Sequence, residues 1–199
     1  SLAEMCGNGI RVMAKYLVVH GHQGEGIFAI NTRDGIKHLR VPAEGDISVN
    51  MGKVQDESEE ITASQNGHIW NGFNISIGNP HAVVFVEDLN LVGELTDAPI
   101  VRPKESYPEG VNVEFVEFIS DSELKMRVFE RGSGETQSCG TGTCAVALAA
   151  TLKKNKNLPA KWVIYPPGGR LEVDIDGHSN ATLIGPAELV RDVDLAKFL

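Results

Sequence analysis

Cys6-Gly7-Asn8-Gly9-Ile10-Arg11-Val12-Met13-Ala14 has a counterpart later in the chain, Cys139-Gly140-Thr141-Gly142-Thr143-Cys144-Ala145-Val146-Ala147. The two stretches match at a cysteine, at two glycines and at the alanine eight residues after the cysteine. In each, apolar residues then recur at the three- and four-residue spacing of one helix face, over residues 10–21 and 142–154. We therefore expect a short repeat in which two helices each begin at a Cys-Gly-x-Gly turn.

The rest of the sequence is typical of strands and turns. Runs rich in β-branched or alternating residues are expected as strands, at 27–30, 38–41, 47–49, 69–77, 82–86, 112–118, 124–129, 162–165, 170–175 and 181–184. Residues 52–67 are polar and poor in apolar side chains, which predicts a surface connection, and residues 88–108 are expected to be partly helical. Because strands come in runs with two isolated helices, the pattern indicates an α+β fold and argues against a doubly wound parallel sheet.

Composition and charge exclude several classes of function. The 199 residues allow one large domain or two small ones, and 42% hydrophobic with 23% charged residues is ordinary for a globular protein. A net charge of -9, with no basic run longer than Lys153-Lys154, argues against a nucleic-acid partner. No apolar stretch approaches the roughly 18 residues of a membrane span, so no membrane partner is expected. Three cysteines without a CxxC pair favour a reducing cytoplasm.

The two cysteine turns indicate a particular chemistry. Free N–H groups and the helix dipole favour negative charge at a helix N-terminus, and such positions can lower a cysteine pKa from about 8.5 to roughly 3.5–7.5. We therefore expect both thiols to be acidic. One thiol could remove a proton from a carbon while the other delivers a proton to the opposite face, which inverts the stereocentre. A substrate carboxylate could bind between the backbone N–H groups of the two turns, which belong to Gly7, Asn8, Gly140 and Thr141.

Three further motifs accompany the cysteine turns. They are Gly78-Asn79-Pro80-His81-Ala82, Gly110-Val111-Asn112-Val113 and Glu130-Arg131-Gly132-Ser133-Gly134-Glu135-Thr136. With Glu4-Met5-Cys6-Gly7-Asn8-Gly9 and Cys139-Gly140-Thr141-Gly142, in this order, they resemble the diaminopimelate epimerase family over essentially the whole chain. The resemblance implies interconversion of LL- and meso-2,6-diaminopimelate in lysine biosynthesis, with no pyridoxal phosphate or other cofactor and no metal.

The resemblance also implies an architecture. Members of the family are homodimers whose subunits have two domains, each a mixed, mostly antiparallel sheet rolled around a central helix, with the active site between the domains. In this chain the first domain would comprise residues 1–50 and 186–199, and the second would comprise residues 51–185. The family has a strand-rich segment with substrate contacts before the first cysteine, whereas this sequence enters the turn almost at once. We therefore expect a truncated chain whose catalysis requires an upstream segment.

Individual roles follow from the same motifs. Cys6 and Cys139 resemble the acid–base pair, and the two turns resemble the cradle of the reacting carboxylate. Diaminopimelate carries a carboxylate and an ammonium at each end, which suits an arginine, a glutamate and amides. The residues that resemble the substrate contacts of the family are Asn79, Asn112, Glu130 and Arg131, and those that resemble its modulators of thiol pKa are His81 and Glu130.

Other interpretations of these residues remain open. Cys139 with His81 could serve a cysteine hydrolase, which would leave the repeat at Cys6 unexplained, and a proline racemase-like enzyme would also use paired cysteines. The chain could also bind its ligand without turnover. Cys144 is expected in the core. The match of residues 140–145 to a loose dinucleotide-binding pattern is discounted, because no strand is predicted before it and no acidic residue follows about 20 residues later.

Overall fold

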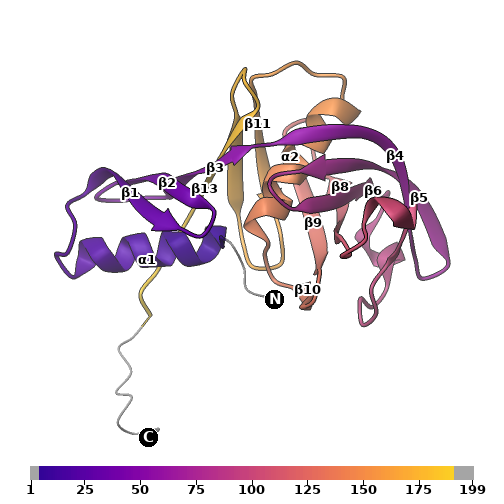
Figure 1. Cartoon of the computed structure of the whole chain (residues 1–199), viewed down its shortest axis with the longest axis horizontal. Helices are drawn as coiled ribbons and strands as arrows, with labels where there is room; N and C mark the ends of the chain where they lie inside the picture. The colour runs from indigo at the N-terminus through magenta and orange to yellow at the C-terminus, as the bar shows by residue number, and fades with distance from the viewer. Residues whose placement is uncertain (1–4, 191–199) are drawn as a thin grey trace, which may run out of the picture.

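The computed structural model describes residues 5–190 and contains two α-helices, two short 3₁₀ helices and thirteen strands within that range (Figure 1). The helices are α1 (Gly7–Val19), η1 (Leu89–Val92), η2 (Lys104–Ser106) and α2 (Gly140–Lys153). The strands are β1 (Gly26–Thr32), β2 (Gly35–Val41), β3 (Ile47–Lys53), β4 (Gln55–Gln65), β5 (His68–Ser76), β6 (Pro80–Phe85), β7 (Ile100–Arg102), β8 (Asn112–Phe118), β9 (Glu123–Glu130), β10 (Gly134–Thr136), β11 (Ala160–Tyr165), β12 (Leu171–Ile175) and β13 (Asn180–Gly185).

All the described strands belong to one continuous, strongly curved sheet. Twelve of them follow the order β1-β2-β3-β13-β12-β11-β9-β8-β6-β5-β4-β7, and β10 pairs with β9. The neighbours are antiparallel except for β6 with β8 and β9 with β11, which are parallel. The sheet is therefore mixed but mostly antiparallel, and the predicted α+β class is confirmed.

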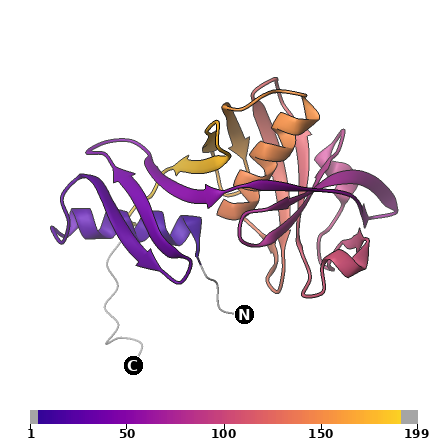
Figure 2. The same ribbon diagram turned by 45° about the horizontal axis from the view of Figure 1, so that its top comes forward.

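The sheet forms two lobes, each built around one of the helices (Figures 1 and 2). In the smaller lobe, α1 packs on β2 and β3; in the larger lobe, α2 contacts β5, β6, β8, β11, β12 and β13. Helix α2 carries mostly small and apolar residues on every side. It is buried from Gly140 to Thr151 apart from Thr141, as a helix enclosed by a sheet requires. Helix α1 buries one face, at Ile10 and Ala14, and exposes Met13 and Tyr16.

The expected surface connection over residues 52–67 is wrong, because most of this stretch is the long strand β4. Side chains 55–60 are exposed, which explains the polar composition, whereas Ile61 and Ala63 turn inward to the core. The pairing register of β4 with β5 shifts between Asp56 and Glu60, and Ser58 has φ of 57°. This bulge interrupts the alternation that would have identified a strand. The short strand β10 was missed because its three residues include no apolar side chain.

Strand β3 links the two lobes through its antiparallel pairing with β13. The division into residues 1–50 with 186–199 and residues 51–185 stays a prediction, and its parts at 1–4 and 191–199 lie outside the described residues. Within residues 5–190, no helix is long and apolar enough to cross a membrane.

Candidate active site

Both predicted cysteine turns are helix N-caps of the same geometry. Cys6 has φ and ψ of -127° and 113°, and Cys139 has -121° and 116°, so each cysteine is extended while the next residue begins a helix. Each Sγ accepts a hydrogen bond of 3.4 Å from the third amide of its helix, that of Gly9 for Cys6 and that of Gly142 for Cys139. A sulfur occupies the position that a capping oxygen normally takes. The repeat seen in the sequence is therefore also a repeat of local structure.

The two turns meet at their glycines. A Cβ atom on Gly140 would lie 3.1 Å from the Cα of Gly7, and a Cβ atom on Gly7 would lie 2.9 Å from Cδ2 of Leu183. The Asn8 side chain bridges the turns by donating to the carbonyl of Ser138 at 3.3 Å. Only residues without side chains allow this approach. It brings together two helix N-termini, whose partial positive charges and free N–H groups both favour an anion between them.

The two thiols have different surroundings. Cys6 is exposed, whereas Cys139 has only 7% of its surface accessible. Burial, followed by the nearby carboxylates of Glu114 and Glu130, raises the pKa of Cys139 to about 12, against the hydrogen bonds from Thr141 and Gly142 that lower it. The expectation that both thiols are acidic is therefore wrong for Cys139, because desolvation and two carboxylates outweigh the donors at the helix N-terminus. At neutral pH this thiol keeps its proton.

A chain of hydrogen bonds leads from Cys139 to the predicted pKa modulator. The Thr141 hydroxyl is 3.4 Å from Cys139 Sγ, and Asn79 Nδ2 donates to that hydroxyl oxygen at 3.4 Å. Asn79 Oδ1 is in turn 3.1 Å from His81 Nε2. The other ring nitrogen, Nδ1, is 2.7 Å from Glu114 Oε1. The structure thus joins Thr141, Asn79 and His81 to one cysteine, and adds Glu114, which sequence reasoning missed.

The remaining predicted substrate contacts gather at the adjoining ends of β8 and β9. Asn112 lies opposite His81 in the β6–β8 pair, donates to the Pro80 carbonyl at 3.1 Å and accepts from the Arg131 amide at 2.9 Å. Glu130 accepts a hydrogen bond from the Thr136 hydroxyl. The guanidinium of Arg131 is half-buried and faces Glu109, at 3.7 Å from the carboxylate. Asn112, Glu130 and Arg131 therefore lie beside the chain of hydrogen bonds at Cys139, and none of them contacts the sulfur of Cys6 or Cys139.

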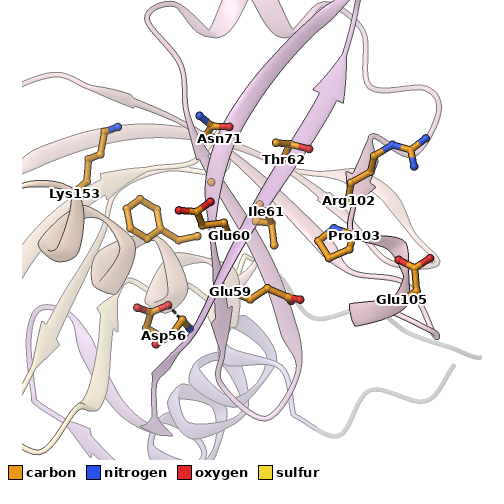
Figure 3. Close-up of a pocket in the computed structure, with 13 residues that line it drawn as sticks. Asp56, Glu59, Glu60, Ile61, Thr62, Asn71, Arg102, Pro103, Glu105 and Lys153 are labelled. Atoms are coloured by element: carbon orange, nitrogen blue, oxygen red, sulfur yellow. Dashed lines mark hydrogen bonds between the residues drawn. The ribbon is translucent and has the colours of Figure 1, made fainter.

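The cavities do not enclose the predicted residues together. Cys6 lines a pocket of about 530 Å³ with Met13, and Asn79 lines a separate one of about 530 Å³ with Tyr107. A larger cavity of about 890 Å³ lies on β4, β5 and η2, and in Figure 3 its Glu60 stands between Lys153 and Arg102. That cavity contains none of the predicted site residues, and its several carboxylates would repel the carboxylates of the expected substrate.

The alternative roles of the cysteines are not supported by this geometry. Both ring nitrogens of His81 are engaged by Asn79 and Glu114, and neither bonds Cys139, as a hydrolase nucleophile and base would. Cys144 is fully buried on α2, so its expected place in the core is confirmed. Among residues 5–190, no group of three or more His, Cys, Asp or Glu side chains could hold a metal ion.

Curated proteins named diaminopimelate epimerase match almost the whole of this chain. The chain is 42% identical over 197 residues to the diaminopimelate epimerase of Streptomyces coelicolor, covering 96% of this chain and 68% of the relative. It is 39% identical to the diaminopimelate epimerase of Thermobifida fusca and 36% identical to that of a Geobacillus species, covering 69% and 73% of these relatives. The chain thus spans about 70% of their length.

Solved structures with the same fold are more distant in sequence. A PhzF-family phenazine biosynthesis protein of Bacillus anthracis matches with a TM-score of 0.70 at 15% identity, covering 92% of this chain and 73% of that protein. A hydroxyproline epimerase of Agrobacterium vitis matches with a TM-score of 0.68 at 15% identity, covering 92% and 64%. The sequence model described as diaminopimelate epimerase matches residues 73–190. With the identities above, this shows that the chain belongs to the diaminopimelate epimerase family.

Proposed function

We propose that the protein is an isomerase that interconverts LL- and meso-2,6-diaminopimelate, in the biosynthesis of lysine. The single observation that carries this proposal is the contact of the two cysteine-capped helix N-termini at Gly7 and Gly140. It brings two thiols and two sets of free backbone N–H groups to one junction. Family membership supplies the substrate class.

The different surroundings of the two thiols support distinct roles for them in one direction of the reaction. Cys139 is protonated at neutral pH because its pKa is raised to about 12, so it is the thiol that donates a proton. Cys6 is exposed and, once ionised, accepts the proton from the α-carbon on the opposite face. The roles exchange in the reverse direction. Backbone N–H groups at the two helix N-termini stabilise the charge that develops on the carboxylate, and one such donor is worth about 2.7–4 kcal/mol.

The distal end of the substrate would be held by the group at the ends of β8 and β9. Arg131 suits a carboxylate, and Glu130 suits an ammonium. The amides of Asn79 and Asn112 can serve either group. In this proposal the reaction uses no pyridoxal phosphate, since the two thiols and the helix N-termini supply acid, base and charge stabilisation. The working form would be a homodimer in the cytoplasm.

The proposal is tested by following solvent deuterium into the α-carbon of LL- and meso-diaminopimelate. The exchange is measured on the 199-residue chain and on a longer chain that covers the full length of its curated relatives. Cys6→Ala and Cys139→Ala should each abolish inversion of the α-carbon, whereas Cys144→Ser, a change at a cysteine away from the junction, should keep it. Absence of exchange in both chain lengths, or inversion that survives loss of Cys6 or Cys139, would overturn the proposal.

A proline racemase-like activity is the nearest alternative, and likeness of fold does not separate the two. Arg131, Glu130 and the two asparagines offer more charged and polar groups than a compact ring needs. The same exchange assay with L-proline and trans-4-hydroxy-L-proline separates these functions. We expect exchange into diaminopimelate and none into the ring substrates.

A further inference from the structure

A buried glutamate lies behind the active site. Glu114 is on β8, between the apolar residues Val113 and Phe115, and its side chain is 0% exposed. Its Oε1 is 2.7 Å from Nδ1 of His81, whose side chain is also 0% exposed. A carboxylate is rarely buried completely unless it is paired, and a buried pair contributes little to stability after desolvation. Its position next to the thiol chemistry is therefore the more informative feature.

The contacts of His81 determine where its protons are. Asn79 donates through Nδ2 to Thr141, so its Oδ1 is the atom that faces His81 Nε2. An amide oxygen only accepts, which requires a hydrogen on Nε2. On the other side, Nδ1 faces a carboxylate oxygen at 2.7 Å, and a carboxylate also only accepts. If Glu114 is ionised, the imidazole must donate at both nitrogens, which makes it an imidazolium with Glu114 as its counter-ion.

The same contacts give the chain a direction. His81 donates to Asn79, Asn79 donates to the Thr141 oxygen, and the hydroxyl hydrogen of Thr141 is left to point at Cys139 Sγ, 3.4 Å away. We propose that Glu114 is a positioning residue, which keeps His81 protonated on both nitrogens and thereby holds this chain of donors against Cys139. His81 then acts as a fixed donor and does not act as a base. This inference rests on the proposed role of Cys139.

The fit of Glu114 against α2 supports this role. A Cβ atom on Gly142 would lie 2.6 Å from Glu114 Oε1, so the carboxylate touches the turn whose amide donates to Cys139. The carboxylates of Glu114 and Glu130 both raise the pKa of Cys139, and a positive charge on His81 would offset the part that comes from Glu114. Burial raises the pKa of Tyr107, as do the carboxylates of Glu59, Glu114 and Glu57, so Tyr107 stays a neutral hydroxyl.

The protonation of His81 is measured first, by ¹⁵N NMR of the 199-residue chain labelled at histidine, at pH 7. The His81 signals are identified by their absence in His81→Gln. We expect hydrogen on both ring nitrogens in the native chain and on one nitrogen in Glu114→Gln. Glu117→Gln is the matched control, because Glu117 is on the same strand and accepts from the Leu89 amide outside the chain of donors. A bare ring nitrogen on His81 in the native chain would overturn the inference, whether or not Glu114→Gln folds.

The effect on the thiol is measured by alkylation with iodoacetamide at pH 9, in a Cys6→Ala, Cys144→Ala background where Cys139 is the only cysteine. Glu114→Gln removes a carboxylate that raises the pKa of Cys139, and with it the second proton of His81 that holds the chain of donors in place. If Glu114 acts through His81, the loss of the donors must outweigh the loss of the charge, so alkylation should slow about two- to tenfold, the equivalent of one net hydrogen bond. His81→Gln leaves the Glu114 carboxylate without its counter-ion. When Glu114→Gln is added to a chain that already carries His81→Gln, it should therefore accelerate alkylation. A reversal of sign is diagnostic of a residue that acts through His81. An equal slowing in both backgrounds, or no effect, contradicts the inference.

These measurements need no turnover. If deuterium exchange fails while the NMR and alkylation results are as expected, the proposed function is wrong and the role of Glu114 stands. If exchange succeeds and the sign does not reverse, the role of Glu114 is wrong and the proposed function stands.

Discussion

Replacing Gly140 by alanine tests the contact of the two cysteine turns. The new Cβ atom would lie 3.1 Å from the Cα of Gly7 and 3.2 Å from Leu183 Cδ2, whereas ordinary contacts of this kind are 3.4–4 Å. Leu183 can rotate away, but the backbone of Gly7 cannot. The two turns must therefore separate by a few tenths of an ångström, and by nearly 1 Å for a fully relaxed contact.

The cost of this shift should fall on activity more than on stability. Overpacking of a core typically costs about 1–3 kcal/mol, and alanine recovers about 1 kcal/mol of helix propensity relative to glycine. The net loss of folding free energy should be about 0–2 kcal/mol. A misplacement of about 1 Å at a reacting centre can cost roughly a hundredfold in rate, so kcat for deuterium exchange should fall about ten- to a hundredfold in Gly140→Ala.

Exchange rates and urea unfolding are measured together on the form of the protein that turns over. The control is Gly177→Ala, because a Cβ atom at this turn residue meets nothing within 4 Å and its φ suits an alanine. We expect native kcat in the control. A Gly140→Ala variant that folds with native stability and exchanges at the native rate would refute the reasoning that the two turns must touch for catalysis.

Further predictions concern the thiols and the carboxylate beside them. At pH 8, with a pKa of about 12, roughly one Cys139 thiol in ten thousand is ionised, so mass spectrometry should find Cys6 alkylated at least a hundredfold faster, and the opposite order would contradict the assigned environments. The pKa of Cys139 is higher in the folded state than in the unfolded state, so protonation of this thiol stabilises the fold below about pH 9, and this stabilisation is lost as pH rises to about 12. The free energy of unfolding in urea should fall by up to about 4 kcal/mol over this window. If it falls as steeply with pH in Cys139→Ala, the loss does not come from Cys139. Glu130→Gln removes one of the carboxylates that raise the pKa of Cys139, so the pH profile of Cys139 alkylation should move to lower pH.

The architecture was largely predictable because its signals are local. Both helices follow from apolar spacing after a Cys-Gly-x-Gly turn, and most strands follow from β-branched runs between glycine turns. Strand β4 was missed because its first six side chains face solvent and a bulge at Ser58 breaks the alternation. The pairing of β3 with β13 was not predictable, since it joins residues far apart in sequence.

The site was predictable in its residue types and less so in its electrostatics. The motifs named Cys139, Thr141, Asn79 and His81 as site residues with separate roles, and the structure connects them by hydrogen bonds. The raised pKa of Cys139 depends on burial and on carboxylates brought in from β8 and β9, which a helix N-terminus alone does not reveal. Glu114 carried one signal in the sequence, an acidic residue between the apolar residues Val113 and Phe115.

The most direct test of the two-thiol account is the distribution of deuterium during the first few per cent of conversion of LL-diaminopimelate in D₂O. If Cys6 removes the proton and Cys139 delivers a different one, the meso product carries one deuterium at the inverted carbon and the recovered LL substrate carries none. Deuterium at equal levels in recovered substrate and product would show that a single group handles both faces, and would contradict the account.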